Sequence, residues 1–278
     1  MAASNIPPLR TSWLKHLRGR ALNAMGRVPK TKVSPSPTEA ATANRALHEA
    51  LRPAVFGELG GVRPDPSNRH ASWWGGCALG SAEDEVPQGK NRKPMQPILQ
   101  VRMDEIGTAV PGLENIALLT LWLDLDGNIF HPVEGEDFVV STFSSLDELV
   151  PLGPGYRENN AIPTFPVRWN EPVPQQPSGE DFSHLVPSRV AWFDTSRWFF
   201  DNPVYVHASE LQAIHPVKIG GWPTWIHGSQ WRGADSEEDF VLQIDSTQKG
   251  NIGFGDGGSI YLFRNKQNGS WTMRCDFF

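Results

Sequence analysis

Two acidic segments of the sequence carry side chains that could bind a positively charged protein. One segment precedes an apolar run at residues 240–244, and the other follows a hairpin-like pattern in the first half of the chain. Carboxylates on exposed loops attract basic clefts and repel phosphate backbones, so the pattern favours a protein partner over direct nucleic-acid binding. A solvated loop without a partner is the alternative interpretation. The predicted contact residues are Asp235, Glu237, Glu238, Asp239, Glu134, Glu136 and Asp137.

Sequence motifs for catalysis or cofactor binding do not occur at the required spacing. There is no G-x-S-x-G nucleophile motif, no G-x-x-x-x-G-K-S/T phosphate loop and no H-E-x-x-H zinc motif. The glycine-rich segment 254–258 has the composition of a phosphate-binding loop. Residues 259–263 after it have a strand pattern, however, so the helix N-terminus that would bind the anion is missing. We therefore expect a tight turn at 254–258.

Metal binding and cysteine chemistry are also poorly supported by the spacing of residues. The segment 124–128 has the acids and the glycine of a calcium loop, but Trp122 stands at the first ligand position and the closing glutamate is missing. The 8 histidines include no pair at metal-ligand spacing. Cys77 directly follows two glycines and is interpreted as a small core residue rather than a nucleophile. The sequence thus predicts no catalytic residue, no cofactor and no metal.

The composition favours a packed, turn-rich protein in a reducing compartment. The chain has 11 tryptophans for a core, with 24 prolines and 26 glycines for turns between short strands. Its 2 cysteines, Cys77 and Cys275, favour free thiols, although one bridge between them is compatible with the sequence. No apolar run reaches the roughly 18 to 20 residues of a membrane span, and the N-terminus lacks the apolar core of a signal peptide. We expect a cytoplasmic protein.

A basic helical extension, residues 1–52, precedes an acidic body. The net charge is −6, with +7 on residues 1–52 and −13 on the remainder. Apolar residues recur at helical spacing over residues 11–25, with basic residues between them. This amphipathic helix could dock on the body or lie on a membrane surface. A Pro-rich linker follows, and a second helix begins at Thr38 and ends before Pro53.

After Pro53 the pattern changes to short apolar runs bounded by Gly, Pro, Asn and Asp, which predicts strands. Asp126-Gly127 and Asn268-Gly269 predict tight hairpins, since both central residues of a type I′ turn need positive φ. Residues 151–190 are Pro-rich and are interpreted as a connection. The predicted strands are 97–103, 116–125, 129–133, 138–143, 240–244, 259–263 and 271–277.

Similar strand motifs occur twice in the sequence, which predicts an internal duplication. Aligning Gly75 with Gly220, Leu99 with Leu242 and Leu119 with Leu262 gives offsets of 145, 143 and 143 residues. We expect an α+β fold, mainly β, in which an internally duplicated β-rich unit follows an N-terminal helical extension. The predicted first repeat is 53–150 and the second is 191–278.

Three motifs of the second half occur in order. They are residues 218–223 (Lys-Ile-Gly-Gly-Trp-Pro), residues 240–245 (Phe-Val-Leu-Gln-Ile-Asp) and residues 255–263 (Gly-Asp-Gly-Gly-Ser-Ile-Tyr-Leu-Phe). Together they resemble the YwqG-like family of bacterial domains of unknown function. The first half matches more loosely, because Ala78 stands where the family has Pro. The resemblance covers about residues 70–278 and leaves the basic extension unexplained.

The resemblance implies a duplicated β-rich fold without an established activity. Domains of this kind also occur among immunity proteins of bacterial toxin systems, including type VI secretion systems, which act by occluding a toxin. Our leading hypothesis is therefore a non-enzymatic immunity protein that binds a cognate toxin with a basic cleft, such as a nuclease effector. The alternative is a YwqG-like intracellular domain that binds an unknown small molecule or protein. An enzyme would instead show a pocket with convergent polar groups.

Overall fold

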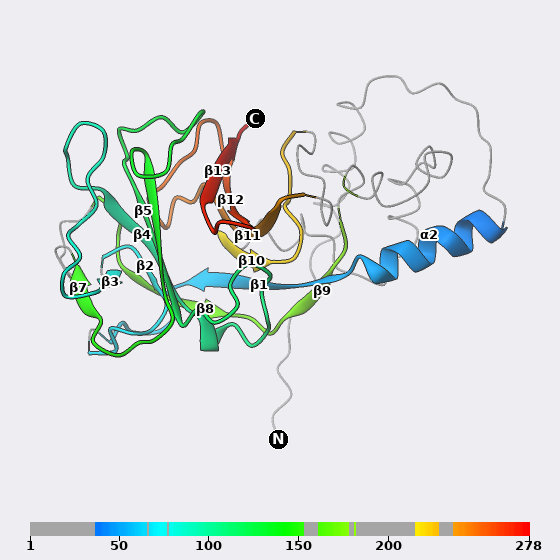
Figure 1. The fold of residues 1–278 in the computed structure, drawn as a ribbon, viewed down its shortest axis with the longest axis horizontal. Coiled ribbons are helices and arrows are strands. Elements are labelled where there is room, and N and C mark those ends of the chain that lie inside the picture. The colour runs from blue at the N-terminus through cyan, green and yellow to red at the C-terminus, as the bar shows by residue number, and fades with distance from the viewer. Residues whose placement is uncertain are drawn as a thin grey trace. The chain divides into compact units, whose positions relative to one another are not determined.

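Short apolar runs bounded by turn residues form strands, as the sequence pattern predicts (Figure 1). The computed structural model describes residues 37–65, 67–76, 78–152, 161–177, 181, 215–227 and 236–278. The predicted helix at 11–25 and Cys77 lie outside these residues. The second predicted helix is α2 (Pro37–Glu49), and residues 37–278 form one compact unit. The fold is mainly β, as expected.

The described strands and one short 3₁₀ helix follow α2 in chain order. They are β1 (Arg52–Leu59), β2 (Trp73–Trp74), β3 (Ala78–Gly80), β4 (Gln96–Arg102), η1 (Met103–Glu105), β5 (Leu118–Leu123), β6 (Phe138–Phe143), β7 (Val150–Leu152), β8 (Phe165–Trp169), β9 (Val173–Gln175), β10 (Val217–Gly220), β11 (Glu238–Asp245), β12 (Ser259–Asn265) and β13 (Trp271–Asp276). The segment 151–190 thus contains β8 and β9.

The strands form one antiparallel sheet in the order β13-β12-β11-β10-β1-β8-β2-β4-β5-β6, and β9 pairs with β1 off this path. A separate pair is formed by β3 and β7. We call β2, β4, β5 and β6 the first half-sheet, and β10, β11, β12 and β13 the second half-sheet. In each half-sheet, the strands follow one another from the centre of the sheet to its edge in the order in which they occur in the sequence. The predicted duplication is therefore visible in the strand order itself.

The two half-sheets also have the same register. A row of directly paired residues crosses each of them from the centre to the edge. The row is Trp74, Leu99, Leu121 and Val140 in the first half-sheet, and Ile219, Leu242, Leu262 and Met273 in the second. Leu262 thus corresponds to Leu121 rather than to Leu119. The sequence alignment found the right strand but was two residues out of register, because Leu recurs at 118, 119 and 121.

Two local irregularities recur at equivalent positions and strengthen the duplication. The β4–β5 register shifts between Pro97 and Leu99, and the β11–β12 register shifts between Phe240 and Leu242. Each β-bulge turns an extra residue toward the core. The Gly-Gly pairs also match, since Gly75, Gly76, Gly220 and Gly221 all have positive φ, between 63° and 71°. A side chain on Gly75 or Gly220 would collide with a backbone carbonyl, so glycine is required there.

The innermost strands are exchanged between the two halves. β1 precedes the first half-sheet in sequence but pairs with β10 of the second, while β8 pairs with β2 of the first. β1 and β8 pair with each other at the centre, where Glu58 lies opposite Arg168. The pairs on either side are Gly57 with Trp169 and Leu59 with Val167. An approximate twofold axis therefore passes through the Glu58–Arg168 pair.

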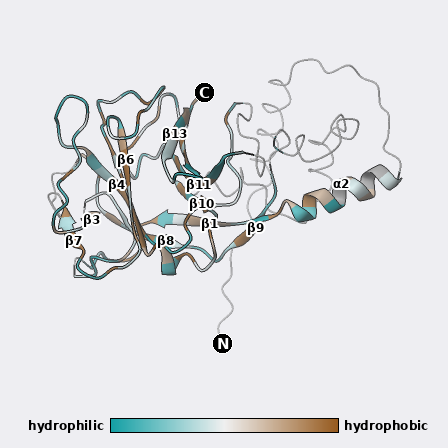
Figure 2. Ribbon diagram, viewed as in Figure 1, coloured by the Kyte–Doolittle hydropathy of each residue, from teal (hydrophilic) through white to brown (hydrophobic). Residues whose placement is uncertain are grey.

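Both half-sheets contribute to one hydrophobic core, which contains residues such as Trp74, Leu121, Ile219 and Leu262. Figure 2 shows the hydrophobic colouring concentrated along the strands. The Trp74 indole donates a hydrogen bond to the Gly250 carbonyl, 3.1 Å away in the loop between β11 and β12. Since Trp74 belongs to the first half-sheet and Gly250 to the second, the halves are packed as one body.

Two details of the sequence prediction are wrong. Residues 129–133 are a loop and not a strand, and the partner of β5 is β6. The turn at Asp126-Gly127 is not type I′, because neither residue has positive φ. The reason is Asp137, whose carboxylate accepts hydrogen bonds from the backbone N–H groups of Asn128 (2.7 Å) and Val133 (2.9 Å) and so holds these residues in a loop. The β12–β13 pairing confirms the hairpin at Asn268-Gly269, but its turn is not type I′ either, because Gly269 has positive φ and Asn268 does not.

Candidate functional site

The predicted acidic segment at residues 134–137 lies in the loop between β5 and β6, and its three acids have different surroundings. Asp137 is buried and organises the loop. Glu136 is exposed and pairs with Lys90 at 3.2 Å. Glu134 is exposed, and its carboxylate accepts a hydrogen bond from the backbone N–H of Trp271 at 3.0 Å. Only Glu134 and Glu136 are therefore accessible to a partner.

The predicted acidic segment at residues 235–239 extends into β11. Asp235 lies outside the described residues, whereas Glu238 and Asp239 belong to the strand. Glu238 pairs with Arg274 at 2.6 Å, and Asp239 lies 3.6 Å from Lys266. Both carboxylates are largely covered, with 18% and 21% of their side chains exposed. Among the described acids of this segment, Glu237 is the exposed one.

The two acidic segments are separated by about 100 residues in the sequence, and each contacts the β12–β13 hairpin. Lys266 on one arm donates its backbone N–H to the Glu237 carbonyl at 2.9 Å. Trp271 on the other arm donates its N–H to Glu134. The hairpin therefore brings the exposed acids of both halves to one region, which sequence separation alone does not indicate.

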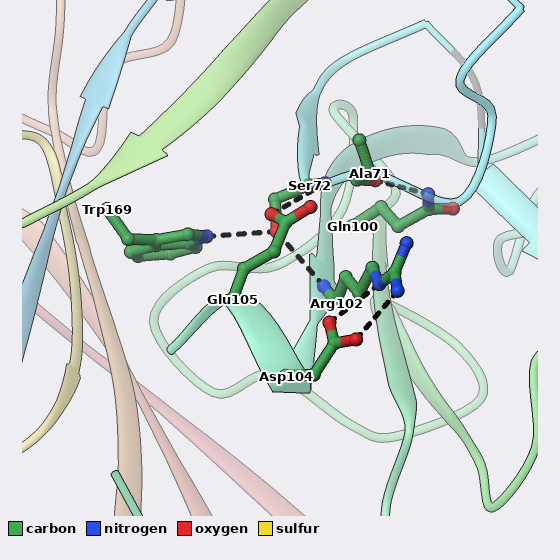
Figure 3. A network of polar contacts seen from close by, with 7 residues as sticks. All are labelled: Ala71, Ser72, Gln100, Arg102, Asp104, Glu105 and Trp169. Carbon is green, nitrogen blue, oxygen red and sulfur yellow. Dashed lines mark hydrogen bonds and ion pairs between the residues drawn. The ribbon is translucent and has the colours of Figure 1, made fainter. Parts of the chain in front are cut away.

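A polar network at the centre of the sheet joins β8 to the first half-sheet (Figure 3). The Ser72 hydroxyl accepts hydrogen bonds from the indole of Trp169 at 2.9 Å and from the backbone N–H of Arg102 at 3.0 Å. Glu105 accepts the N–H of Ser72 at 3.2 Å, and Asp104 pairs with Arg102 at 2.6 Å. The hydrogen-bonding groups of this network are directed at one another, so we assign it a structural role.

Gln100 in this network has an exact counterpart in the second half-sheet. The side-chain oxygen of Gln100 accepts the backbone N–H of Leu79, and that of Gln243 accepts the N–H of Thr224, both at 2.9 Å. Each glutamine thus holds the segment that follows its Gly-Gly pair. The Leu-Gln motif of the sequence is explained by this bond, since the Leu packs in the core and the Gln faces the opposite side.

The outer face of the second half-sheet holds a buried lysine that the sequence analysis did not single out. Lys218 is 1% exposed, and its amino group donates to the Trp222 carbonyl at 2.5 Å and to the Thr224 hydroxyl at 2.8 Å. Burial lowers the pKa of Lys218 to about 7, although Asp245 and Asp181 act in the opposite direction. Lysine between Val217 and Ile219 in an apolar strand was the signal that could have identified it.

Further polar groups converge beside Lys218. Tyr261 donates its hydroxyl to the Thr224 carbonyl at 2.8 Å, and burial raises its pKa. Asp245 accepts hydrogen bonds from Ser259 at 2.6 Å and from the Gln243 amide at 3.0 Å. The first half-sheet lacks this chemistry: by register, Trp73 stands in place of Lys218 and Leu118 in place of Ser259. Only the second half-sheet, within the described residues, has this buried polar cluster.

Other sequence expectations concern metals, cysteines and membranes. Among the described residues, no group of three His, Cys, Asp or Glu side chains could hold a metal ion. Cys275 is a free thiol, and burial raises its pKa to about 11. The segment 254–258 is a turn closed by a bond from Gly258 N–H to the Phe254 carbonyl at 2.7 Å. Within the described ranges, no helix combines the length and apolarity needed to cross a membrane.

Comparison with known families places these features in context. Residues 72–270 match the model of a domain of unknown function (DUF1963). The chain belongs to this family. The match begins at β2 and extends to the β12–β13 hairpin, so it contains Gln100, Gln243 and Lys218. It is consistent with the YwqG-like resemblance noted in the sequence. A search of curated proteins gives no significant match.

Proposed function

We propose that this chain is a non-enzymatic binding protein, and specifically an immunity protein that occludes a bacterial toxin with a basic cleft. The observation that carries the proposal is that both acidic segments contact the same β12–β13 hairpin. A surface that collects exposed carboxylates from distant segments attracts a basic partner and accelerates association. Nuclease toxins have such clefts, because they bind phosphate backbones.

Differences in exposure and pairing give the described contact residues three proposed roles. Glu134, Glu136 and Glu237 are accessible and are the proposed contacts. Asp137 supports the proposed surface by fixing the β5–β6 loop. The paired acids Glu238 and Asp239 are proposed as secondary contacts, since their partners Arg274 and Lys266 already neutralise part of their charge.

The test is protection of bacterial cells. Each gene adjacent to this one in its source genome is expressed with and without the chain, and growth is recorded. We expect one neighbour to arrest growth, the chain to restore growth, and the two purified proteins to form a stoichiometric complex. If no toxic neighbour is rescued or bound, the proposed function is wrong.

A charge-reversal variant tests whether the acidic surface makes the contact. Glu237→Lys should slow association with the rescued toxin by roughly tenfold at low salt, with less effect at high salt, since exposed charges are screened. The matched control is Glu83→Lys, which reverses another exposed acid outside both segments. Equal association rates for the two variants would exclude Glu237 from the interface.

A second candidate function is small-molecule binding in the same fold. The Lys218 cluster favours it, because several polar groups converge there and Lys218 has a strongly perturbed pKa. A strongly shifted pKa within a buried polar cluster is a common feature of functional sites. Thermal-shift screening of metabolite mixtures against the wild type and Lys218→Met would test it: stabilisation limited to the wild type is the expected result.

A further inference from the structure

Exposed apolar side chains are concentrated in two short segments of the described structure. Phe130 in the β5–β6 loop is 58% exposed, and Phe278 after β13 is 78% exposed. Leu125 and Val133 in the same loop are 47% and 49% exposed. Outside these segments, the described residues include two other exposed large apolar side chains, Val62 and Val150. Clustered exposure of this kind marks interaction sites.

The two segments are in contact, although they come from different halves of the chain. The rings of Phe130 and Phe277 pack edge to face with their centroids 5.3 Å apart. The backbone N–H of Phe278 donates to the Asp256 carbonyl at 3.3 Å. Phe130, Phe277 and Phe278, which we call the aromatic ridge, therefore lie together beside the turn at residues 254–258.

The aromatic ridge is held in place by internal bonds. Asp137 fixes the β5–β6 loop through the N–H groups of Asn128 and Val133. Glu134 ties the same loop to β13 through Trp271. A surface that is already ordered loses little conformational entropy on binding, which favours affinity.

An open depression adjoins the ridge. Gly255 and Gly257 are among its lining residues, with others from the segment 246–253. A Cβ atom on Gly255 would lie 2.8 Å from the ring of Phe277, and one on Gly257 would lie 3.8 Å from Phe278. The ridge and the depression are therefore neighbours, and together they offer a partner both a projection and a recess.

The charges around the ridge select the kind of partner. Four exposed acids occur in the β5–β6 loop and in the turn at residues 254–258: Asp126, Glu134, Glu136 and Asp256. Two lysines lie against them, with Lys93 at 2.7 Å from Asp126 and Lys90 at 3.2 Å from Glu136. Acids remain in excess. A second copy of the chain would bring two acidic rims together, whereas a basic protein would be attracted.

We propose that the aromatic ridge is the apolar anchor of the interface with a basic protein partner, inserting Phe130 and Phe278 into an apolar recess within its basic cleft. This inference rests on the proposed function and adds the residues that supply most of the affinity. Aromatic side chains at the centre of an interface commonly dominate binding, while a charged rim governs the association rate.

The experiment measures binding of the toxin identified by growth rescue to the full-length chain. Phe130→Ala and Phe278→Ala should each weaken affinity by roughly 10- to 100-fold, mainly through faster dissociation. Both side chains are exposed, so the melting temperature should stay unchanged. Val62→Ala is the matched control, because Val62 is 52% exposed and lies outside the ridge.

The outcomes separate this inference from the proposed function. If the toxin binds both phenylalanine variants as tightly as the wild type, the ridge is not the anchor and the immunity function stands. If the wild type binds no neighbouring gene product, both proposals fail. If the wild type is a dimer that Phe130→Asp converts to a monomer in sedimentation experiments, the ridge joins two copies of the chain, and the heterologous partner is wrong.

Discussion

The two half-sheets share one backbone pattern but differ in the chemistry of their outer faces. Both have a Gly-Gly turn, a bulged strand and a glutamine that binds the following segment. The first outer face contains the apolar cluster of Ala78, Met95 and Trp122. The second contains Lys218 and its polar neighbours beside an aromatic cluster of Trp222, Phe240, Tyr261 and Phe263. The repeated features are those that the backbone requires, and the divergent ones are free to serve a function.

The loop at the edge of the first half-sheet contacts the edge strand of the second. The loop before β6 projects exposed apolar and acidic residues, and Glu134 from this loop covers the N–H of Trp271 on β13. The proposed binding surface therefore uses elements of both halves. Duplication supplied the scaffold, and unequal loops created the surface.

The largest expected difference concerns Lys218. Its folded pKa of about 7 lies below the ordinary value of 10.5, so the unfolded chain binds more protons between these values. Stability should therefore rise by several kcal/mol from about pH 7 to pH 10.5 and stay level just below pH 7. Lys218→Met should lack this rise in urea unfolding measured across that range. Parallel pH profiles for the two proteins would show that Lys218 remains charged in the folded state.

A smaller effect is expected at the two equivalent glutamines. Gln100→Leu and Gln243→Leu each leave a backbone N–H without its acceptor, which should cost about 1 to 3 kcal/mol in the free energy of unfolding. Gln100→Leu should cost more, because the Gln100 amide donates to two backbone carbonyls, those of Arg69 and Ala71, both at 2.8 Å, whereas the Gln243 amide donates to the Asp245 carboxylate, which keeps its bond from Ser259. Denaturant titration measures both values. If either substitution left the free energy of unfolding unchanged, the two glutamines would not be equivalent.

The smallest effect is expected on the approximate twofold axis. Glu58 and Arg168 form an ion pair, but 35% and 45% of their side chains are exposed. Glu58→Gln should therefore change the free energy of unfolding by less than about 1 kcal/mol. The control is Glu83→Gln. A loss well above that limit would show that the central pair is needed to join the exchanged strands.

Much of the local structure could be predicted from the sequence. The helix α2, most of the strands and the duplication follow from the spacing of apolar residues and from the glycine motifs. The loop at 129–133 could not be predicted, because its residues have strand propensity and the buried Asp137 overrides it through tertiary bonds. Phe130 was missed for the same reason, since it was interpreted as part of a strand.

The candidate sites were predictable in composition but not in arrangement. Sequence identified the acids, but gave no means to distinguish exposed Glu237 from Glu238, which is covered by its pairing with Arg274. Lys218 was overlooked because a lysine is ordinarily exposed, and its burial depends on bonds to Trp222 and Thr224 that lie on its outer side.

The sequence by itself determined that a β-rich unit is present twice, because turn glycines and alternating apolar residues act over a few neighbouring positions. Only the tertiary structure decided that β1 and β8 exchange between the halves, since these strand pairs join residues more than 90 positions apart. Only it decided that Phe130 meets Phe277 and that Glu134 meets Trp271. Those contacts arise when two packed halves bring their edges together, and no local pattern encodes that approach.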